Sequence, residues 1–312
     1  MESNIRAAIT GGTGFLGAAL ANGILDRGGE VAVLARKDSP HRWRLPARPG
    51  LVVLEADLER LGEAAPGLRH FGPEVFFHLG WIGVGNRFRN DPVQVRNILA
   101  TADAVRLAAE CGCRRWVGTG SQAEYGPLNR RISEADPMEP TTLYGACKVA
   151  AWALARVLGA QAGLETVWAR VFSTYGPGDD EGWMLTKVIG QLLAGERPSL
   201  TAGAQAWDYL HVADAAEALL RLGTAPRVAG AYNLGSGQAR TIRAIVEMTR
   251  DLIDPRLPLG FGEVPYRPDQ VMHLEADISR LRQDTGWSPA VGLEAGIAGL
   301  IQGLREPGKP NS

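Results

Sequence analysis

The chain has 312 residues, of which 45% are hydrophobic and 21% are charged, and its formal net charge at pH 7 is −1. A nearly neutral chain lacks the basic excess with which proteins bind nucleic acid or anionic membranes. The three cysteines lack metal-ligand spacing, the five histidines are scattered, and no apolar run approaches the ~18 residues of a membrane span. We therefore expect a cytoplasmic α/β protein with reduced thiols, no signal peptide and no metal site.

A glycine-rich stretch, TGGTGFLG at 10–17, follows a short apolar strand at 5–9 and precedes an apolar helix at 18–25. Glycine permits the tight turn and lets a pyrophosphate approach the main chain, while free N–H groups at the helix start bind phosphates. An unrelated glycine-rich turn is the alternative, but the order strand, loop and helix favours a dinucleotide site. Its predicted contacts are Gly11, Gly14, Phe15, Leu16 and Gly17.

The second predicted strand covers residues 30–35. In NAD-binding proteins an acidic residue usually ends this strand and binds the ribose hydroxyls. Here Ala35 is followed by Arg36 and Lys37. A guanidinium can bind a 2′-phosphate through two hydrogen bonds, so we predict a preference for NADP(H) through Arg36. The alternative is that Arg36 is only a solvated loop charge.

Two more apolar strands are predicted at 51–58 and 74–80, and a loop with aromatic residues and glycines follows at 81–95. The ends of parallel strands border the ligand site of an open α/β sheet. We assign four residues at these two strand ends to the cofactor site, namely Asp57, Leu58, Leu79 and Gly80. Trp81, the first residue of the loop, either contacts substrate or anchors the loop.

The fifth strand, at 114–120, ends at Ser121, and a helix opening at 142–143 carries Tyr144 and Lys148. Residues four apart lie on one helical face, so the phenol and the ammonium are neighbours. A sixth strand follows at 165–172 and brings Val171 to the cofactor edge.

The regular alternation of strands and helices breaks after residue 172. We predict a dinucleotide-binding Rossmann lobe, a doubly wound parallel sheet made of residues 1–172 and about 207–233. A smaller C-terminal α/β substrate lobe comprises 173–206 and 234–304, and residues 305–312 form a disordered tail.

Several blocks then occur in an order that resembles the extended short-chain dehydrogenase/reductases, the NAD-dependent epimerase/dehydratase family of nucleotide-sugar enzymes. They are the glycine stretch, Asp57-Leu58, His78-Leu79-Gly80, Ser121 before Tyr125-Gly126, Tyr144-x-x-x-Lys148, 170–177 and 207–214. The resemblance implies a strand order of 3-2-1-4-5-6 with extra parallel strands. It also implies a nucleotide-sugar substrate and a homodimer formed through a four-helix bundle.

The resemblance further implies a catalytic triad of Ser121, Tyr144 and Lys148. A phenol has an unperturbed pKa near ~10, and a neighbouring ammonium favours its ionised form. Lys148 would also hold the nicotinamide ribose, and Ser121 would donate to the substrate oxygen. For Glu124 we expect only a surface or loop hydrogen bond.

Sugar 4,6-dehydratases resemble Thr-Asp-Glu-x-Tyr-Gly at this loop, whereas this chain has Ser121, Gln122 and Ala123 there. Without that acid pair we expect no dehydration. The interpretation is instead an NADPH-dependent reduction of a nucleoside-diphosphate 4-keto-6-deoxy sugar. Its predicted substrate contacts are Trp81, Ser121, Gln122, Trp207 (where the family often has arginine) and Arg267.

Three alternatives remain open. The first is a nucleotide-sugar 4-epimerase with tightly bound NAD. The second is a reductase of non-sugar carbonyls, which the departure at Trp207 allows. The third is a dinucleotide-sensing regulatory protein, which the pair Tyr144 and Lys148 disfavours because such proteins usually lose it.

Overall fold

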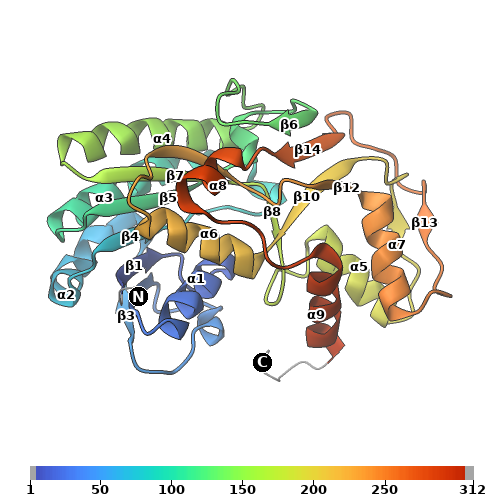
Figure 1. Ribbon diagram of the computed structural model, residues 1–312, viewed down its shortest axis with the longest axis horizontal. Helices are drawn as coiled ribbons and strands as arrows, with labels where there is room; N and C mark the ends of the chain where they lie inside the picture. Colours follow the sequence, from blue (N-terminus) through green and yellow to red (C-terminus); the bar gives the residue numbers. More distant parts are fainter. Residues whose placement is uncertain (1–4, 306–312) are drawn as a thin grey trace.

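A seven-stranded parallel sheet forms the centre of the computed structural model, which describes residues 5–305 (Figure 1). From edge to edge its strand order is β11-β7-β5-β4-β1-β2-β3. The predicted order 3-2-1-4-5-6 is therefore confirmed, with β11 added beside β7. The strands are β1 (Arg6–Thr10), β2 (Glu30–Ala35), β3 (Leu51–Glu55), β4 (Val75–His78), β5 (Arg115–Ser121), β7 (Glu165–Val171) and β11 (Gly230–Leu234).

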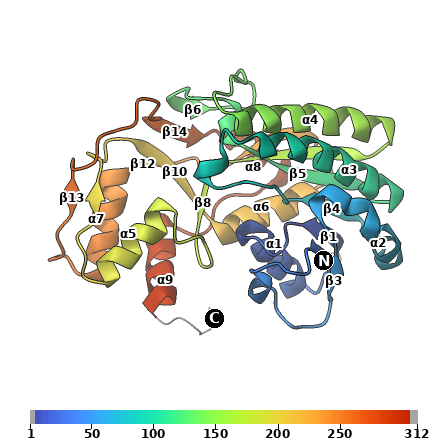
Figure 2. The same cartoon turned by 180° about the vertical axis from the view of Figure 1, so that it is seen from behind.

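Helices cover both faces of this sheet, as expected for a doubly wound fold. On one face α1 (Phe15–Asp26) packs against α6 (Val212–Thr224), and on the other α3 (Arg96–Glu110) packs against α4 (Leu143–Gln161), with α2 (Ala65–Phe71) beside them (Figures 1 and 2). Each face has its own apolar core. The predicted α/β Rossmann fold is thus the observed one.

Helix α4 has the length and hydropathy of a membrane-crossing helix, and it alone does so among residues 5–305. Its buried face, which includes Tyr144 and Lys148, packs against α3, β5 and β7. Its apolar character is therefore accounted for by the protein core.

The remaining elements gather at the other end of the molecule (Figure 1). Helices α5 (Met184–Leu193), α7 (Ile242–Ile253) and α9 (Leu293–Arg305) surround a third apolar core. Two small sheets accompany them, and α8 (Ser279–Thr285) packs against β11. The strands of the small sheets are β6 (Arg130–Ile132), β8 (Ser173–Tyr175), β9 (Ser199–Leu200), β10 (Ala206–His211), β12 (Ala239–Thr241), β13 (Gly260–Phe261) and β14 (His273–Ala276).

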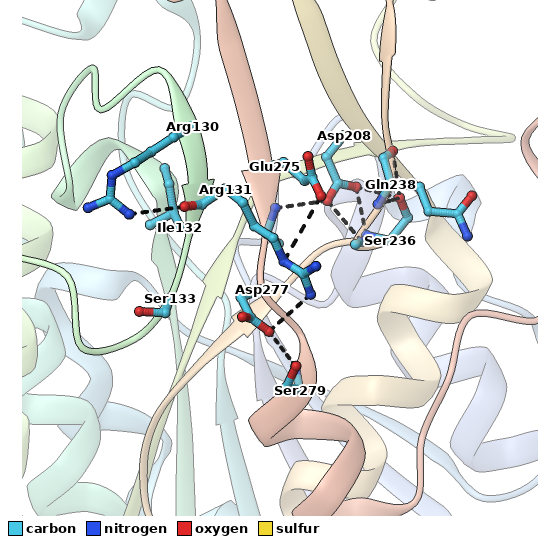
Figure 3. A network of polar contacts seen from close by, with 12 residues as sticks. Arg130, Arg131, Ile132, Ser133, Asp208, Ser236, Gln238, Glu275, Asp277 and Ser279 are labelled. Atoms are coloured by element: carbon cyan, nitrogen blue, oxygen red, sulfur yellow. Dashed lines mark hydrogen bonds and ion pairs between the residues drawn. The ribbon is translucent and has the colours of Figure 1, made fainter.

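A buried carboxylate on β10 joins these segments (Figure 3). Asp208 accepts hydrogen bonds from the N–H groups of Ser236, Gly237 and Ala276 at 2.7 to 3.0 Å, and from the Ser236 hydroxyl at 2.6 Å. Burial raises the pKa of Asp208, while these donors lower it. Because the donors come from β14 and from the turn after β11, the carboxylate holds both segments against β10 in one arrangement.

Some predicted boundaries were wrong. The third strand ends at Glu55, because Asp57 caps a 3₁₀ segment at 58–64 by accepting the Glu59 N–H at 2.9 Å. The stretch 260–275 includes β13 and most of β14, although its sequence is polar and rich in proline. Of the predicted tail, Arg305 still belongs to α9, and residues 306–312 lie outside the described residues.

Candidate active site

The glycine stretch forms a tight turn between β1 and α1. Gly11 has φ of +69°, and the Gly14 N–H donates to the Gly11 carbonyl at 2.9 Å. A Cβ at Gly17 would lie 2.2 Å from the Gly11 oxygen, so only glycine fits there. Gly14 precedes α1 without a side-chain cap, which leaves the first helical N–H groups, at Phe15 and Leu16, to a ligand.

The ends of β1 and β4 lie against each other beside this turn. A Cβ on Gly11 would come 2.7 Å from the Gly80 nitrogen, and one on Gly80 would come 2.7 Å from the Leu58 side chain. The predicted residues around 57–58 and 79–80 are therefore brought together with the glycine stretch. This bare cradle has the shape and the free donors that a dinucleotide pyrophosphate requires.

The segment after β2 reaches over the same turn. Ser39 donates to the Thr13 hydroxyl at 2.9 Å. Arg36 is exposed, and its Nε lies 3.9 Å from the equally exposed Asp38. The guanidinium is thus near the cradle and weakly paired.

The predicted catalytic side chains meet at the start of α4. Thr142 caps the helix by accepting the Gly145 N–H at 3.1 Å. Tyr144 and Lys148 follow on its buried face, with 9% and 3% of their surfaces exposed. Lys148 Nζ donates to the Thr119 carbonyl on β5 at 2.7 Å. The strand then ends at Ser121, which hydrogen-bonds to Tyr144.

Burial controls the ionisation of these groups. It raises the pKa of Tyr144, although the hydrogen bond to Ser121 and the positive charge of Arg89 lower it. It lowers the pKa of Lys148 from 10.5 to about 7, against the charge of Glu124, which raises it. Buried His78 has a pKa of about 3, so it is neutral, and its Nδ1 lies 2.8 Å from the Thr10 hydroxyl. The Tyr144 phenol is therefore protonated at neutral pH.

The loop at 81–95 forms one wall of this site. Lys148 Nζ lies 3.6 Å from the centroid of the Trp81 ring, and the same ring meets Tyr144 edge-on at 5.9 Å. The Trp81 indole donates to buried Gln94 at 2.8 Å, so its orientation is set from below. Arg89 completes the wall, since its carbonyl accepts the Tyr144 N–H at 2.8 Å and its guanidinium lies 5.4 Å from the Tyr144 ring centroid.

The other predicted contacts differ in their surroundings. Gln122 follows Ser121 in a short 3₁₀ turn, and Val171 pairs with Ser121 in the sheet register. Trp207 donates from its indole to the Ser173 hydroxyl at 2.6 Å, so it offers a ring face rather than a charge. Arg267 is exposed, with Nε 3.8 Å from Asp269, and its role in binding stays a prediction.

The expectation for Glu124 was wrong. Its side chain is completely buried and accepts from the Arg170 guanidinium and the Trp168 indole. It also accepts the Ser121 N–H, while Ser121 accepts the Ala123 N–H, so residues 121–124 form a capping box. The spacing Ser-x-x-Glu is the sequence signal of that motif and could have identified Glu124.

The arrangement combines a protonated phenol, a hydroxyl and a buried amine beside a dinucleotide cradle. These groups can pass a proton to or from a carbonyl oxygen and stabilise the charge that develops on it. Within residues 5–305 no group of three His, Cys, Asp or Glu side chains is arranged to hold a metal ion.

Comparison with known proteins agrees with this site. A family model described as the NAD dependent epimerase/dehydratase family matches residues 7–235. UDP-glucuronic acid decarboxylase 1 of Arabidopsis thaliana is 26% identical over 319 residues, which cover 97% of this chain and 71% of the relative.

Solved structures are similar over the same length. UDP-glucose 4-epimerase of Thermus thermophilus, in complex with NAD, has a TM-score of 0.84 at 26% identity and covers 97% of this chain and 100% of its own. UDP-N-acetylglucosamine 4-epimerase from Methanobrevibacter ruminantium has a TM-score of 0.87 at 23% identity, covering 97% and 98%, and shares the fold. With the family model spanning most of its length, the chain belongs to the NAD-dependent epimerase/dehydratase family, within the extended short-chain dehydrogenase/reductases.

Proposed function

We propose that the protein reduces the 4-keto group of a nucleoside-diphosphate 4-keto-6-deoxy sugar with NADPH. The observation that carries the proposal is the convergence of Ser121, Tyr144 and Lys148 beside the glycine cradle. The nucleotide sugar would lie between the cofactor lobe predicted at 1–172 with about 207–233 and the substrate lobe predicted at 173–206 and 234–304.

The cofactor is a nicotinamide dinucleotide, as in the related structure solved with NAD. Gly11, Gly14 and Gly17 with the first N–H groups of α1 would hold its pyrophosphate, and Lys148 its nicotinamide ribose. When bound, it supplies the hydride that the carbonyl carbon accepts.

The chain's own groups handle the proton. Tyr144 is the donor, because burial raises its pKa and keeps the phenol protonated at neutral pH. Ser121 donates a hydrogen bond to the same carbonyl oxygen and so orients it toward Tyr144. After transfer, protonated Lys148, one helical turn away, stabilises the phenolate until it regains a proton from solvent.

Elimination of water is disfavoured by the residues at the loop. Gln122 and Ala123 have no carboxylate. Glu124 does not replace one, because its oxygens accept from Ser121, Trp168 and Arg170 inside the core. A carboxylate held in this way cannot remove a substrate proton.

The preference for NADPH is supported at the end of β2. Ala35 is buried and uncharged, and the side chain of Arg36 is 59% exposed beside the cradle. An acidic side chain at position 35 would repel a 2′-phosphate, whereas Arg36 can bind one in bidentate fashion. A net reductase consumes its cofactor as a second substrate, which fits this preference.

NADPH oxidation, followed by absorbance, tests the proposal with a panel of 4-keto-6-deoxy nucleotide sugars. We expect turnover by the wild type and a loss of about a hundredfold or more in Tyr144→Phe, which removes only the donated proton. Equal activity of Tyr144→Phe would refute the assigned role.

A 4-epimerase with bound NAD is the second candidate, because the Thermus thermophilus structure of similar fold is a UDP-glucose 4-epimerase with NAD. Protein that purifies with NAD(H) and interconverts UDP-sugars, with no oxidation of added NADPH, would establish this activity instead.

A further inference from the structure

The reaction as proposed leaves one buried ion pair unused. Glu124 is 0% exposed, and its partner Arg170 is 3% exposed. Arg170 Nε donates to Glu124 Oε2 at 2.8 Å. A buried pair of this kind is weak evidence for stability, because taking both charges out of water is costly. Its position directly behind Ser121 suggests another role.

The carboxylate contacts the catalytic loop directly. Glu124 Oε1 accepts the Ser121 N–H at 2.8 Å and the Trp168 indole N–H at 2.9 Å. With Ser121 Oγ accepting from Ala123 at 3.2 Å, the loop has a single hydrogen-bonded arrangement. The Ser121 side chain that results from it is the one that hydrogen-bonds to Tyr144.

Arg170 extends this network into three other segments. Its Nη1 donates to the Tyr125 hydroxyl at 2.7 Å, and that hydroxyl donates to Asn233 on β11 at 2.7 Å. Asn233 in turn donates to the Ile132 carbonyl on β6 at 2.9 Å. A buried network with its members paired is rigid, so Glu124 is itself held in place.

The same carboxylate faces Lys148 across an indole. Trp168 donates its N–H to Glu124, and its ring centroid lies 5.8 Å from Lys148 Nζ. The other titratable groups around this ammonium are His78 from β4, which is neutral, and Tyr144 from α4. Glu124 is the group whose negative charge raises the pKa of Lys148 against burial.

We propose that Glu124, paired with Arg170, is a positioning residue that fixes Ser121 for the reaction and supplies the negative charge behind Lys148. The inference rests on the function proposed above, in which Ser121 and Lys148 act on the substrate. It identifies Glu124 as a residue that acts through its neighbours and does not touch substrate.

Glu124→Gln is the direct test, because it keeps Oε1 for Ser121 and removes the charge. Since it also leaves Arg170 buried without a counter-ion, Glu124→Gln with Arg170→Met is the companion variant, in which neither charge remains. Glu165→Gln is the matched control. Glu165 pairs with buried Arg115 at 2.6 Å at the opposite end of the same two strands.

A readout independent of substrate is available because the chain has four lysines, Lys37, Lys148, Lys187 and Lys309. In protein labelled with ¹³C at lysine Cε, the resonance missing from Lys148→Met identifies Lys148. We expect its NMR titration midpoint, near 7 in the wild type, to fall in both Glu124 variants and to stay unchanged in Glu165→Gln.

Kinetics give the second readout. With the proposed substrate, we expect kcat of both Glu124 variants to fall by about tenfold to a hundredfold, with the KM for NADPH unchanged. The alkaline limb of the kcat profile should move to lower pH, since deprotonation of Lys148 comes earlier.

The outcomes separate the two proposals. An unchanged Lys148 midpoint and wild-type kcat in the folded Glu124 variants would overturn the inference. A shifted midpoint in a protein whose wild type reduces none of the sugars would overturn the proposed function and support the electrostatic role of Glu124.

Discussion

Replacing Lys148 by methionine should stabilise the folded protein at low pH while removing its activity. Lys148 is 3% exposed, and burial lowers its pKa from 10.5 to about 7. Below pH 7 both the folded and the unfolded chain carry the proton, and the folded state bears the full cost of the buried charge. That cost is about 5 kcal/mol, at about 1.4 kcal/mol for each pKa unit.

Methionine also loses interactions that lysine makes. The Thr119 carbonyl is left without its donor, at about 2 kcal/mol, and the contact between the ammonium and Trp81 is lost, at about 1 kcal/mol. At pH 6 the net gain in the free energy of unfolding is therefore about 2 kcal/mol. For a chain of this length that corresponds to a rise in Tm of about 3 °C.

The sign of the effect should reverse as the pH rises. Between pH 7 and 10.5 the unfolded chain binds more protons at Lys148 than the folded chain, so wild-type stability increases with pH through this group. At pH 9.5 the cost of the buried charge is about 1.4 kcal/mol, smaller than the lost contacts, and the variant should be less stable than wild type by about 1.5 kcal/mol.

Chemical denaturation at pH 6, 8 and 9.5, without cofactor, measures this difference. Lys187→Met, at an exposed position of α5, is the control and should show little dependence on pH. A Lys148→Met protein that is no more stable than wild type at pH 6, or whose difference from wild type is the same at every pH, would refute the reasoning.

Three further predictions concern the surface of the protein, with exposed Arg256→Ala as the control for the two arginine variants. Arg36→Ala should raise the KM for NADPH about tenfold or more and leave that for NADH unchanged, because it removes the proposed 2′-phosphate contact; equal use of both cofactors by the wild type would contradict it. Arg267→Ala should raise the KM for the nucleotide sugar about tenfold without changing kcat, and an unchanged KM would exclude Arg267 from the site. Leu99 on α3 is 70% exposed on the helix pair proposed to form the dimer, so Leu99→Glu should convert a dimer to a monomer in light scattering, whereas Val264→Glu, also at an exposed apolar side chain, should not; a wild type that is already monomeric would refute the dimer.

Most of the large sheet could be predicted from the sequence, because its strands are continuous apolar runs that alternate with helical segments. The glycine stretch and the pair Tyr144 and Lys148 could be predicted as well, since their chemistry depends on spacing within one turn or one helix. The short strands β6, β13 and β14 could not, because they are short and owe their conformation to pairing partners far along the chain.

The candidate site divides in the same way. The sequence by itself determined a dinucleotide cradle, a phenol and an ammonium on one helical face, and the absence of carboxylates at Gln122 and Ala123. Only the tertiary structure decided that Trp81 covers Lys148 and that Glu124 is buried against Arg170, 46 residues later in the chain. The physical reason is that the pKa of a group depends on burial and on charges brought near it from other strands, and those distances exist only in the folded protein.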